Sequence, residues 1–196
     1  MQKQFGKHHQ SKTLIKLLSI NFVMFILELG IGWRAESSAL IADALDNFAD
    51  FLVYGVALYA VGKSNELKTN AAMFSGMLQV ILGLLVLGDV LRRFLYGSEP
   101  FSILMMFMGS FALLANLYCL RLIMRYHNAE VHMRASWIFT INDVFANLGV
   151  IIAGILVWQF NSHWPDIIIG SLVALIVLFG AKTIIHEVNE VLDSRK

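Results

Sequence analysis

Six of the fourteen acidic residues fall inside stretches that are otherwise apolar: Glu28, Asp43, Asp46, Asp50, Asp89 and Asp143. Asp46 and Asp50 are four residues apart, so on a helix they share one face, with Cβ atoms about 5 to 6 Å apart. Two carboxylates this close in a low-dielectric medium do not both stay ionised unless a cation lies between them; otherwise one keeps a proton. The pair therefore predicts a site for a metal ion or a proton.

A second pair with the same spacing occurs later in the chain. Residues 143–147 (DVFAN) echo residues 46–50 (DNFAD), so an acid is again followed by an oxygen ligand four positions on. Carboxylate and amide oxygens are ligands for hard divalent cations. The candidate metal site predicted from the sequence is an all-oxygen cage of Asp46, Asp50, Asp143 and Asn147.

The other three buried acids have competing explanations. Asp89 is followed by Arg92 and Arg93 at i+3 and i+4, a spacing that favours an ion pair within one helix over a metal ligand. Glu28 lies toward the end of its apolar stretch, where a hydrogen bond to a neighbouring helix is the alternative to function. Asp43 stands near a helix entrance, and the alternatives to its joining the site are that water reaches it there or that it shapes the start of the helix.

A purely structural polar network is the main alternative for the predicted ligands. An Asp at the centre of a membrane helix costs roughly 2.5 to 3.5 kcal/mol, whereas each Leu, Ile, Phe or Val returns about 0.3 to 0.6 kcal/mol. For residues 39–61, three Asp cost about 7.5 to 10.5 kcal/mol, whereas the ten Leu, Ile, Phe and Val residues return ~5 kcal/mol. We therefore expect this helix to turn its acids toward other helices or a wet cavity. For Asn142 and Asn147 the alternative stays open, because asparagine often joins membrane helices.

The elements that carry these residues are membrane spans. Of 196 residues 58% are hydrophobic and 15% charged, and the mean hydropathy is +0.68. The apolar residues fall into segments of about 20, the length that crosses roughly 30 Å of hydrocarbon. The predicted fold is an all-α integral membrane protein with six transmembrane helices, at residues 14–33, 39–61, 71–91, 101–124, 136–158 and 167–185.

Charge distribution predicts the orientation. Twelve of the fifteen Lys and Arg lie on one side of these spans, and only Arg34, Arg92 and Arg93 lie on the other. Because cytoplasmic loops are rich in Lys and Arg, both termini are predicted to be cytoplasmic. The predicted organisation is an N-terminal cytoplasmic tail (1–13), a six-helix domain (14–186) and a short cytoplasmic tail (187–196). The net charge of +1 argues against a nucleic-acid partner.

The two acid pairs also suggest internal symmetry. Each pair lies in the middle helix of a three-helix half, and the two halves cross the membrane in opposite directions. This is the pattern of an inverted repeat, in which a binding site forms between the halves near the membrane midplane.

Residues 38–50 (SALIADALDNFAD) closely resemble the second helix of the cation diffusion facilitator family, which are divalent-metal exporters with six transmembrane helices. The similarity extends over nearly the whole chain and includes Glu28 with Gly30, residues 143–147, and residues 164–170 (WPDIIIG). The resemblance implies a homodimer and metal/proton antiport.

The family resemblance also implies a ligand set. Its tetrahedral transport site takes a His-or-Asp and an Asp, four residues apart, from the second helix, and a similar pair from the fifth. Asp46 and Asp50 match the first pair, and Asp143 matches the last ligand.

The chain departs from the family pattern in three places. The usual histidine of the fifth helix falls at Phe139, so the fourth ligand is missing or comes from Asn142, Asn147 or water. The histidine-rich stretch between the second and third helices is replaced by residues 63–68 (KSNELK). The sequence stops at residues 193–196, where many members continue into a metal-sensing domain, so we expect a short form of the family.

The buried acids predict transport of a divalent cation, and the family resemblance implies that it is exported by proton antiport. Zn²⁺ is the first expectation, with Co²⁺, Cd²⁺, Mn²⁺ and Fe²⁺ as further substrates. The ion would enter from the cytoplasm, bind Asp46, Asp50 and Asp143, and leave outward while protons compete for the same carboxylates. We expect no permanent cofactor. The expected partners are the metal ion, protons, the lipid bilayer and a second copy of the chain, in a bacterial inner membrane.

Three other functions compete with this prediction. The same acids would serve a proton-coupled exporter of organic cations, or a scaffold in which they only pack helices. An intramembrane metal-dependent hydrolase is the third, but neither H-E-x-x-H nor G-x-S-x-G occurs in the sequence. We therefore expect a secondary transporter and not an enzyme.

Overall fold

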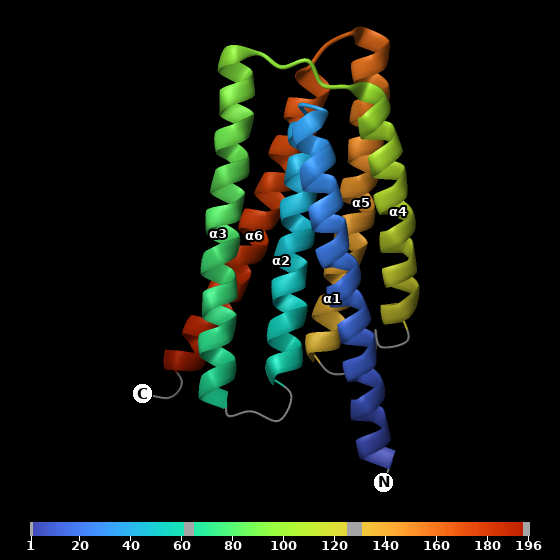
Figure 1. The fold of residues 1–196 in the computed structure, drawn as a ribbon. Coiled ribbons are helices and arrows are strands. Elements are labelled where there is room, and N and C mark those ends of the chain that lie inside the picture. The colour runs from blue at the N-terminus through green and yellow to red at the C-terminus, as the bar shows by residue number, and fades with distance from the viewer. Residues whose placement is uncertain (1, 61–64, 125–130, 194–196) are drawn as a thin grey trace.

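The computed structural model describes residues 2–60, 65–124 and 131–193, and six helices account for almost all of them (Figure 1). In chain order they are α1 (Gln2–Arg34), α2 (Ser38–Ala60), α3 (Asn65–Tyr96), α4 (Ser102–Ile123), α5 (Val131–Phe160) and α6 (Trp164–Asp193). The described ranges contain no strand. The predicted all-α fold is confirmed, and each predicted span corresponds to one helix.

Several helices run beyond the predicted spans. α1 begins at Gln2 instead of Leu14, and α6 continues to Asp193, past the predicted end at Ile185. Most of the residues predicted as tails, 1–13 and 187–196, are therefore helical. Where the membrane boundaries fall along these helices, and with them the division into tails and domain, stays a prediction.

Among the described residues, five helices are long and apolar enough to cross a membrane: α1, α3, α4, α5 and α6. Their most apolar windows have mean hydropathies between 1.8 and 2.4. α2 is not among them, because Asp43, Asp46 and Asp50 interrupt its apolar residues. The chain is thus an integral membrane protein whose second helix carries three acids.

The helices pack mainly as three antiparallel pairs, α1 with α2, α3 with α6 and α4 with α5 (Figure 1). α2 contacts all five of the other helices. The helix with the most buried acids is therefore the one most enclosed by protein, as its insertion cost requires. Small residues bring the pairs close: a Cβ on Gly154 of α5 would lie 2.9 Å from the Met106 side chain of α4.

The two ends of the bundle differ. Both termini lie at one end, here called the terminal end, and the opposite end carries the connections 35–37, 97–101 and 161–163 (Figure 1). We call this opposite end the loop end. The aromatic residues Trp33, Tyr96, Trp158 and Trp164 lie there and are 49 to 84% exposed, as expected of side chains at a membrane interface.

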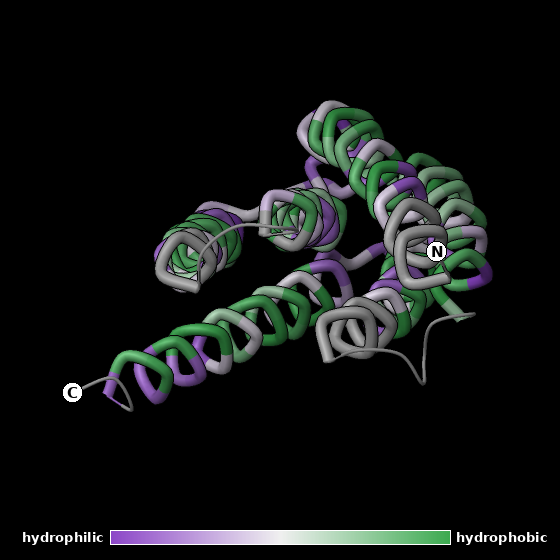
Figure 2. Tube along the Cα trace, turned by 90° about the horizontal axis from the view of Figure 1, so that it is seen from below, coloured by the Kyte–Doolittle hydropathy of each residue, from purple (hydrophilic) through white to green (hydrophobic). Residues whose placement is uncertain are grey.

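Polarity in the bundle is reversed relative to a soluble protein. Hydrophobic residues make up most of each helix (Figure 2), and many large apolar side chains are exposed, among them Phe74, Phe107, Leu114, Phe145 and Phe179, each at least 65% exposed. The buried residues, in contrast, include a set of acids and amides: Asn21, Glu28, Asp43, Asn47, Asp50, Asn116, Asp143, Asn147 and Asp166. Lipid is the natural solvent of such an outer surface.

Candidate metal centre

The structure brings together two of the predicted ligands, from different halves of the chain. Asp50 of α2 and Asp143 of α5 are each 4% exposed, and their carboxyl groups interact directly. The Asp50 carboxyl also interacts with the Tyr54 side chain. One turn from the acids, the Tyr54 hydroxyl and the Thr140 Oγ1 are hydrogen-bonded at 3.0 Å, which joins α2 to α5.

The facing acids keep unused oxygen atoms. The Oδ2 atoms of Asp50 and Asp143 are buried without a hydrogen-bond partner. Asn147 donates from Nδ2 to the Asp143 backbone carbonyl at 2.6 Å, which leaves its Oδ1 buried and unpartnered as well. An unsatisfied buried polar group costs about 1 to 3 kcal/mol, more when charged. The three oxygens are thus available for a cation or a proton.

Asp46 is the remaining member of the predicted cage. It is half-buried, and its charge acts on both Asp43 and Asp50. In the part of the chain that the structure describes, no three acid, histidine or cysteine side chains are close enough together to hold a metal ion. The structure thus shows a two-carboxylate centre, and the full cage of Asp46, Asp50, Asp143 and Asn147 stays a prediction.

Several of the sequence-based predictions concern residues beyond those described. The Phe139 side chain lies outside the described residues, although its backbone belongs to α5. Residues 63 and 64 lie outside them too, as do the side chains of residues 65–68, whose backbone belongs to α3. Asn142, the other amide considered as a fourth ligand, is half-buried. The identity of the fourth ligand therefore stays a prediction.

The structure adds residues that the sequence interpretation did not consider. Cys119 of α4 is 1% exposed and lies close to both Asp50 and Asp143. Tyr54 was detectable, because it follows Asp50 by four residues and so shares its helix face. Thr140 and Cys119 gave no such signal, since only packing of separate helices places them near the acids.

Asn116 is a further buried amide near this level of the bundle. A Cβ on Gly109 of α4 would touch Val150 of α5 at 3.1 Å. Asn116 lies seven residues after Gly109 in α4, and Asp143 lies seven residues before Val150 in α5. Because the two helices are antiparallel and rise equally per residue, Asn116 is level with Asp143. Asn116 is fully buried, and neither its Nδ2 nor its Oδ1 has a partner.

The first two helices hold a second group of buried acids. Asn47 donates from Nδ2 to Glu28 Oε2 at 2.7 Å, so Glu28 does hydrogen-bond a neighbouring helix, the structural alternative raised for it. The Asp43 and Glu28 carboxyls contact each other. Asp43 is 1% exposed and therefore not wetted.

Two acids near the loop end, Asp89 and Asp166, are held by ion pairs or hydrogen bonds. Asp89 pairs with Arg92 at 2.9 Å and Arg93 at 2.6 Å, which confirms the predicted ion pair. Asp166 of α6 was not singled out as a candidate, yet it accepts hydrogen bonds from the Ser37 hydroxyl at 2.5 Å and the backbone N–H groups of Ser38 and Ala39 at 2.7 and 3.1 Å. It thereby caps the start of α2 from another helix.

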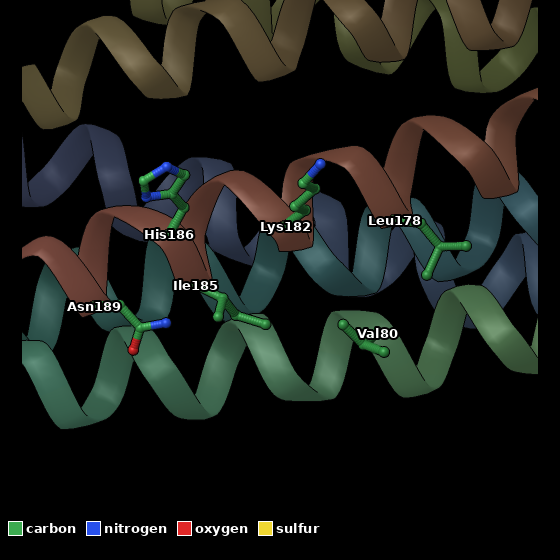
Figure 3. Close-up of a pocket in the computed structure, with 6 residues that line it drawn as sticks. All are labelled: Val80, Leu178, Lys182, Ile185, His186 and Asn189. Carbon is green, nitrogen blue, oxygen red and sulfur yellow. The ribbon is translucent and has the colours of Figure 1, made fainter.

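A cavity of about 410 Å³ lies between α3 and α6, toward the terminal end. Figure 3 shows Ile185 and Asn189 extending from α6 toward α3, whereas Lys182 and His186 extend away from it. None of the predicted metal ligands lines this cavity. Its lining consists of apolar side chains, two basic ones and the Asn189 amide, and offers no carboxylate to a cation.

Comparison with known proteins identifies the family of this chain. The model for the cation efflux transmembrane domain matches residues 14–192. Zinc transporter ZitB of Yersinia pestis is 25% identical over an alignment covering 93% of this chain and 63% of that protein. ZitB of Pectobacterium atrosepticum is 28% identical, with coverages of 93% and 62%.

The cadmium, cobalt and zinc/H(+)-K(+) antiporter of Bacillus subtilis is 26% identical, covering 88% of this chain and 61% of the antiporter. The chain thus spans about three fifths of the length of these relatives. The family match covers nearly the whole chain and confirms the resemblance carried by residues 38–50. This protein, with its enclosed acidic second helix, therefore belongs to the cation efflux family.

Proposed function

We propose that this chain exports a divalent metal cation across the membrane in exchange for protons. The observation that carries the proposal is the direct contact of Asp50 and Asp143, two buried acids from α2 and α5 with unpartnered oxygens. Such a pair is stable when a cation or a proton lies between the carboxylates. The family match and the zinc, cadmium and cobalt named for the relatives support a metal cation.

The proposed mechanism uses one site for both ions. A metal ion enters from the cytoplasm, binds Asp46, Asp50 and Asp143 with help from Asn147, and leaves outward as the helix halves rock. Metal binding needs deprotonated carboxylates. Protons from the outside therefore compete with the metal for the same oxygens and promote its release. The substrate proposed first is Zn²⁺, with Co²⁺, Cd²⁺, Mn²⁺ and Fe²⁺ as competitors.

Purified protein in liposomes tests the proposal. Vesicles would hold a metal-sensitive dye and a pH-sensitive dye, and a panel of these metals would be added outside. We expect metal uptake accompanied by proton release from the vesicle. Metal uptake with no proton movement would contradict antiport, and proton release driven only by organic cations would favour the rival exporter.

The proposal includes an orientation and an assembly, both termini in the cytoplasm of a bacterial inner membrane and a homodimer. The excess of Lys and Arg at the terminal end supports the orientation, and the relatives cited above are bacterial. An impermeant thiol reagent added outside should label Glu99→Cys and not Asp193→Cys. The reverse labelling would overturn the orientation, and a monomer in native-lipid mass measurements would refute the dimer.

A further inference from the structure

A separate set of buried oxygens lies between α1 and α2. Glu28, Asp43 and Asn47 are 0, 1 and 2% exposed, respectively. The Asn47 amide holds Glu28 Oε2 at 2.7 Å, and the Glu28 and Asp43 carboxyls touch. Seven residues separate Asp43 from Asp50, which places this set about 10 Å along α2 from the Asp50–Asp143 pair, toward the loop end.

Each of these three side chains keeps one oxygen without a partner. Glu28 Oε1, Asp43 Oδ2 and Asn47 Oδ1 are all buried and accept no hydrogen bond. The described ion pairs involve Asp89 and Glu190, and none of them includes Glu28 or Asp43. Two buried acids in contact, with no basic partner in the described residues, call for a positive ion.

The chemistry of the three oxygens favours a metal ion over a proton. A shared proton would join the two carboxyls but would leave Asn47 Oδ1 without a partner. A divalent cation would use carboxylate and amide oxygens together, and hard cations such as Mn²⁺ prefer these ligands. Apolar packing surrounds these oxygens in the seam between α1 and α2, where Phe25 and Phe48 stack with ring centroids 4.6 Å apart.

We propose that Glu28, Asp43 and Asn47 form a second divalent-cation site, distinct from the Asp50–Asp143 pair. For its role, the inference rests on the proposed function: an exported ion would halt here after leaving the pair, with Asp46 lying on the same helix between the two sites. The binding itself is independent of transport. It predicts two bound ions per chain.

Electron paramagnetic resonance counts bound Mn²⁺ directly on the full chain in lipid nanodiscs. We expect two ions per chain in the wild type and one in the variant Glu28→Gln with Asp43→Asn, whose amides keep the size and most hydrogen bonds of the acids. Asp50→Asn with Asp143→Asn should also keep one ion. Glu36→Gln with Glu99→Gln, which removes two exposed acids at the loop end, is the matched control and should keep two.

Two results would overturn this second site. One is an unchanged number of bound ions in Glu28→Gln with Asp43→Asn, which would mean that the acids share a proton. The other is loss of both ions when the single variant Glu28→Gln is titrated with Mn²⁺. This variant retains an acceptor for the Asn47 amide. The proposal expects that its affinity for Mn²⁺ falls by at least about tenfold at one site only. Failure of metal transport by the wild type would refute the proposed function, whereas the ion count would still decide this site.

Discussion

Asp166 and Asp143 are both buried aspartates at helix contacts, yet their oxygens have opposite surroundings. At the loop end, Asp166 accepts three hydrogen bonds from the start of α2. In the bundle interior, Asp143 faces another acid and keeps an oxygen without a partner. A satisfied buried acid stabilises the fold, whereas an unsatisfied one destabilises it and is available for a ligand.

The contrast extends to the neighbours of each residue. Ser38, which gives its backbone N–H to Asp166, also donates from its hydroxyl to Asp89 at 3.2 Å, and Asp89 is held by two arginines. The loop end is thus a network that ties α2, α3 and α6 together. The interior acids Asp50 and Asp143 have no such set of donors, which leaves their Oδ2 atoms available for the cation proposed to bind there.

The largest expected effect is on transport. Asp50→Ala and Asp143→Ala should each abolish metal uptake into inverted vesicles, because each removes half of the two-carboxylate centre. Folded protein should remain in the membrane, since the lost oxygens were partly unsatisfied. Glu187→Ala, the same change on an exposed helix surface, is the control. Wild-type transport by either interior variant would refute the centre, and loss of folded protein would support a purely structural role.

The next effect is on stability at the loop end. Asp166→Ala leaves three donors at the start of α2 without an acceptor, so we expect a loss of about 2 to 5 kcal/mol in the free energy of unfolding. Cys119 is the lone cysteine and is buried, so a thiol-reactive dye reports melting. Asp143→Asn should melt within a few degrees of the wild type. Equal melting temperatures for Asp166→Ala and the wild type would contradict the contrast between the two regions.

A smaller loss of stability should follow from crowding the contact between α6 and the start of α2. A Cβ on Gly170 would lie 2.8 Å from the Ser38 backbone carbonyl carbon and 3.0 Å from the Ala39 nitrogen. Gly170→Ala should therefore cost about 1 to 3 kcal/mol, because backbone atoms cannot move aside. Gly88→Ala meets nothing within 4 Å and should be neutral or stabilising by up to about 1 kcal/mol. Equal dye-monitored melting of the two variants would show that α6 and α2 separate easily.

The smallest expected effect is on selectivity. Carboxylate and amide oxygens discriminate less against Mn²⁺ and Fe²⁺ than imidazole does, so wild-type Zn²⁺ transport should show appreciable competition from Co²⁺, Cd²⁺, Mn²⁺ or Fe²⁺. Phe139→His should shift preference toward Zn²⁺ by about tenfold or less, as one imidazole ligand is added. Competition assays in liposomes measure the shift. Strict Zn²⁺ selectivity in the wild type would show that these oxygens do not set the choice.

Local patterns in the sequence were enough to predict six helices, their location in a membrane and the acids that are candidate metal ligands. Apolar segments of about 20 residues specify spans, because the thickness of the bilayer fixes their length. Spacing within one helix predicted the Asp89 ion pair, because residues at i, i+3 and i+4 are neighbours on any α-helix. The family, too, was recognisable from residues 38–50.

Contacts between helices were decided by the tertiary structure alone. Asp166 lies near the start of α6, and no local pattern indicates that it caps α2, which begins 128 residues earlier at Ser38. Likewise, the pairing of Asn47 with Glu28 and the joining of Tyr54 to Thr140 depend on the register between separate helices. That register is set by side-chain packing along each pair, and helix periodicity fixes only which residues share a face, not which helix faces them.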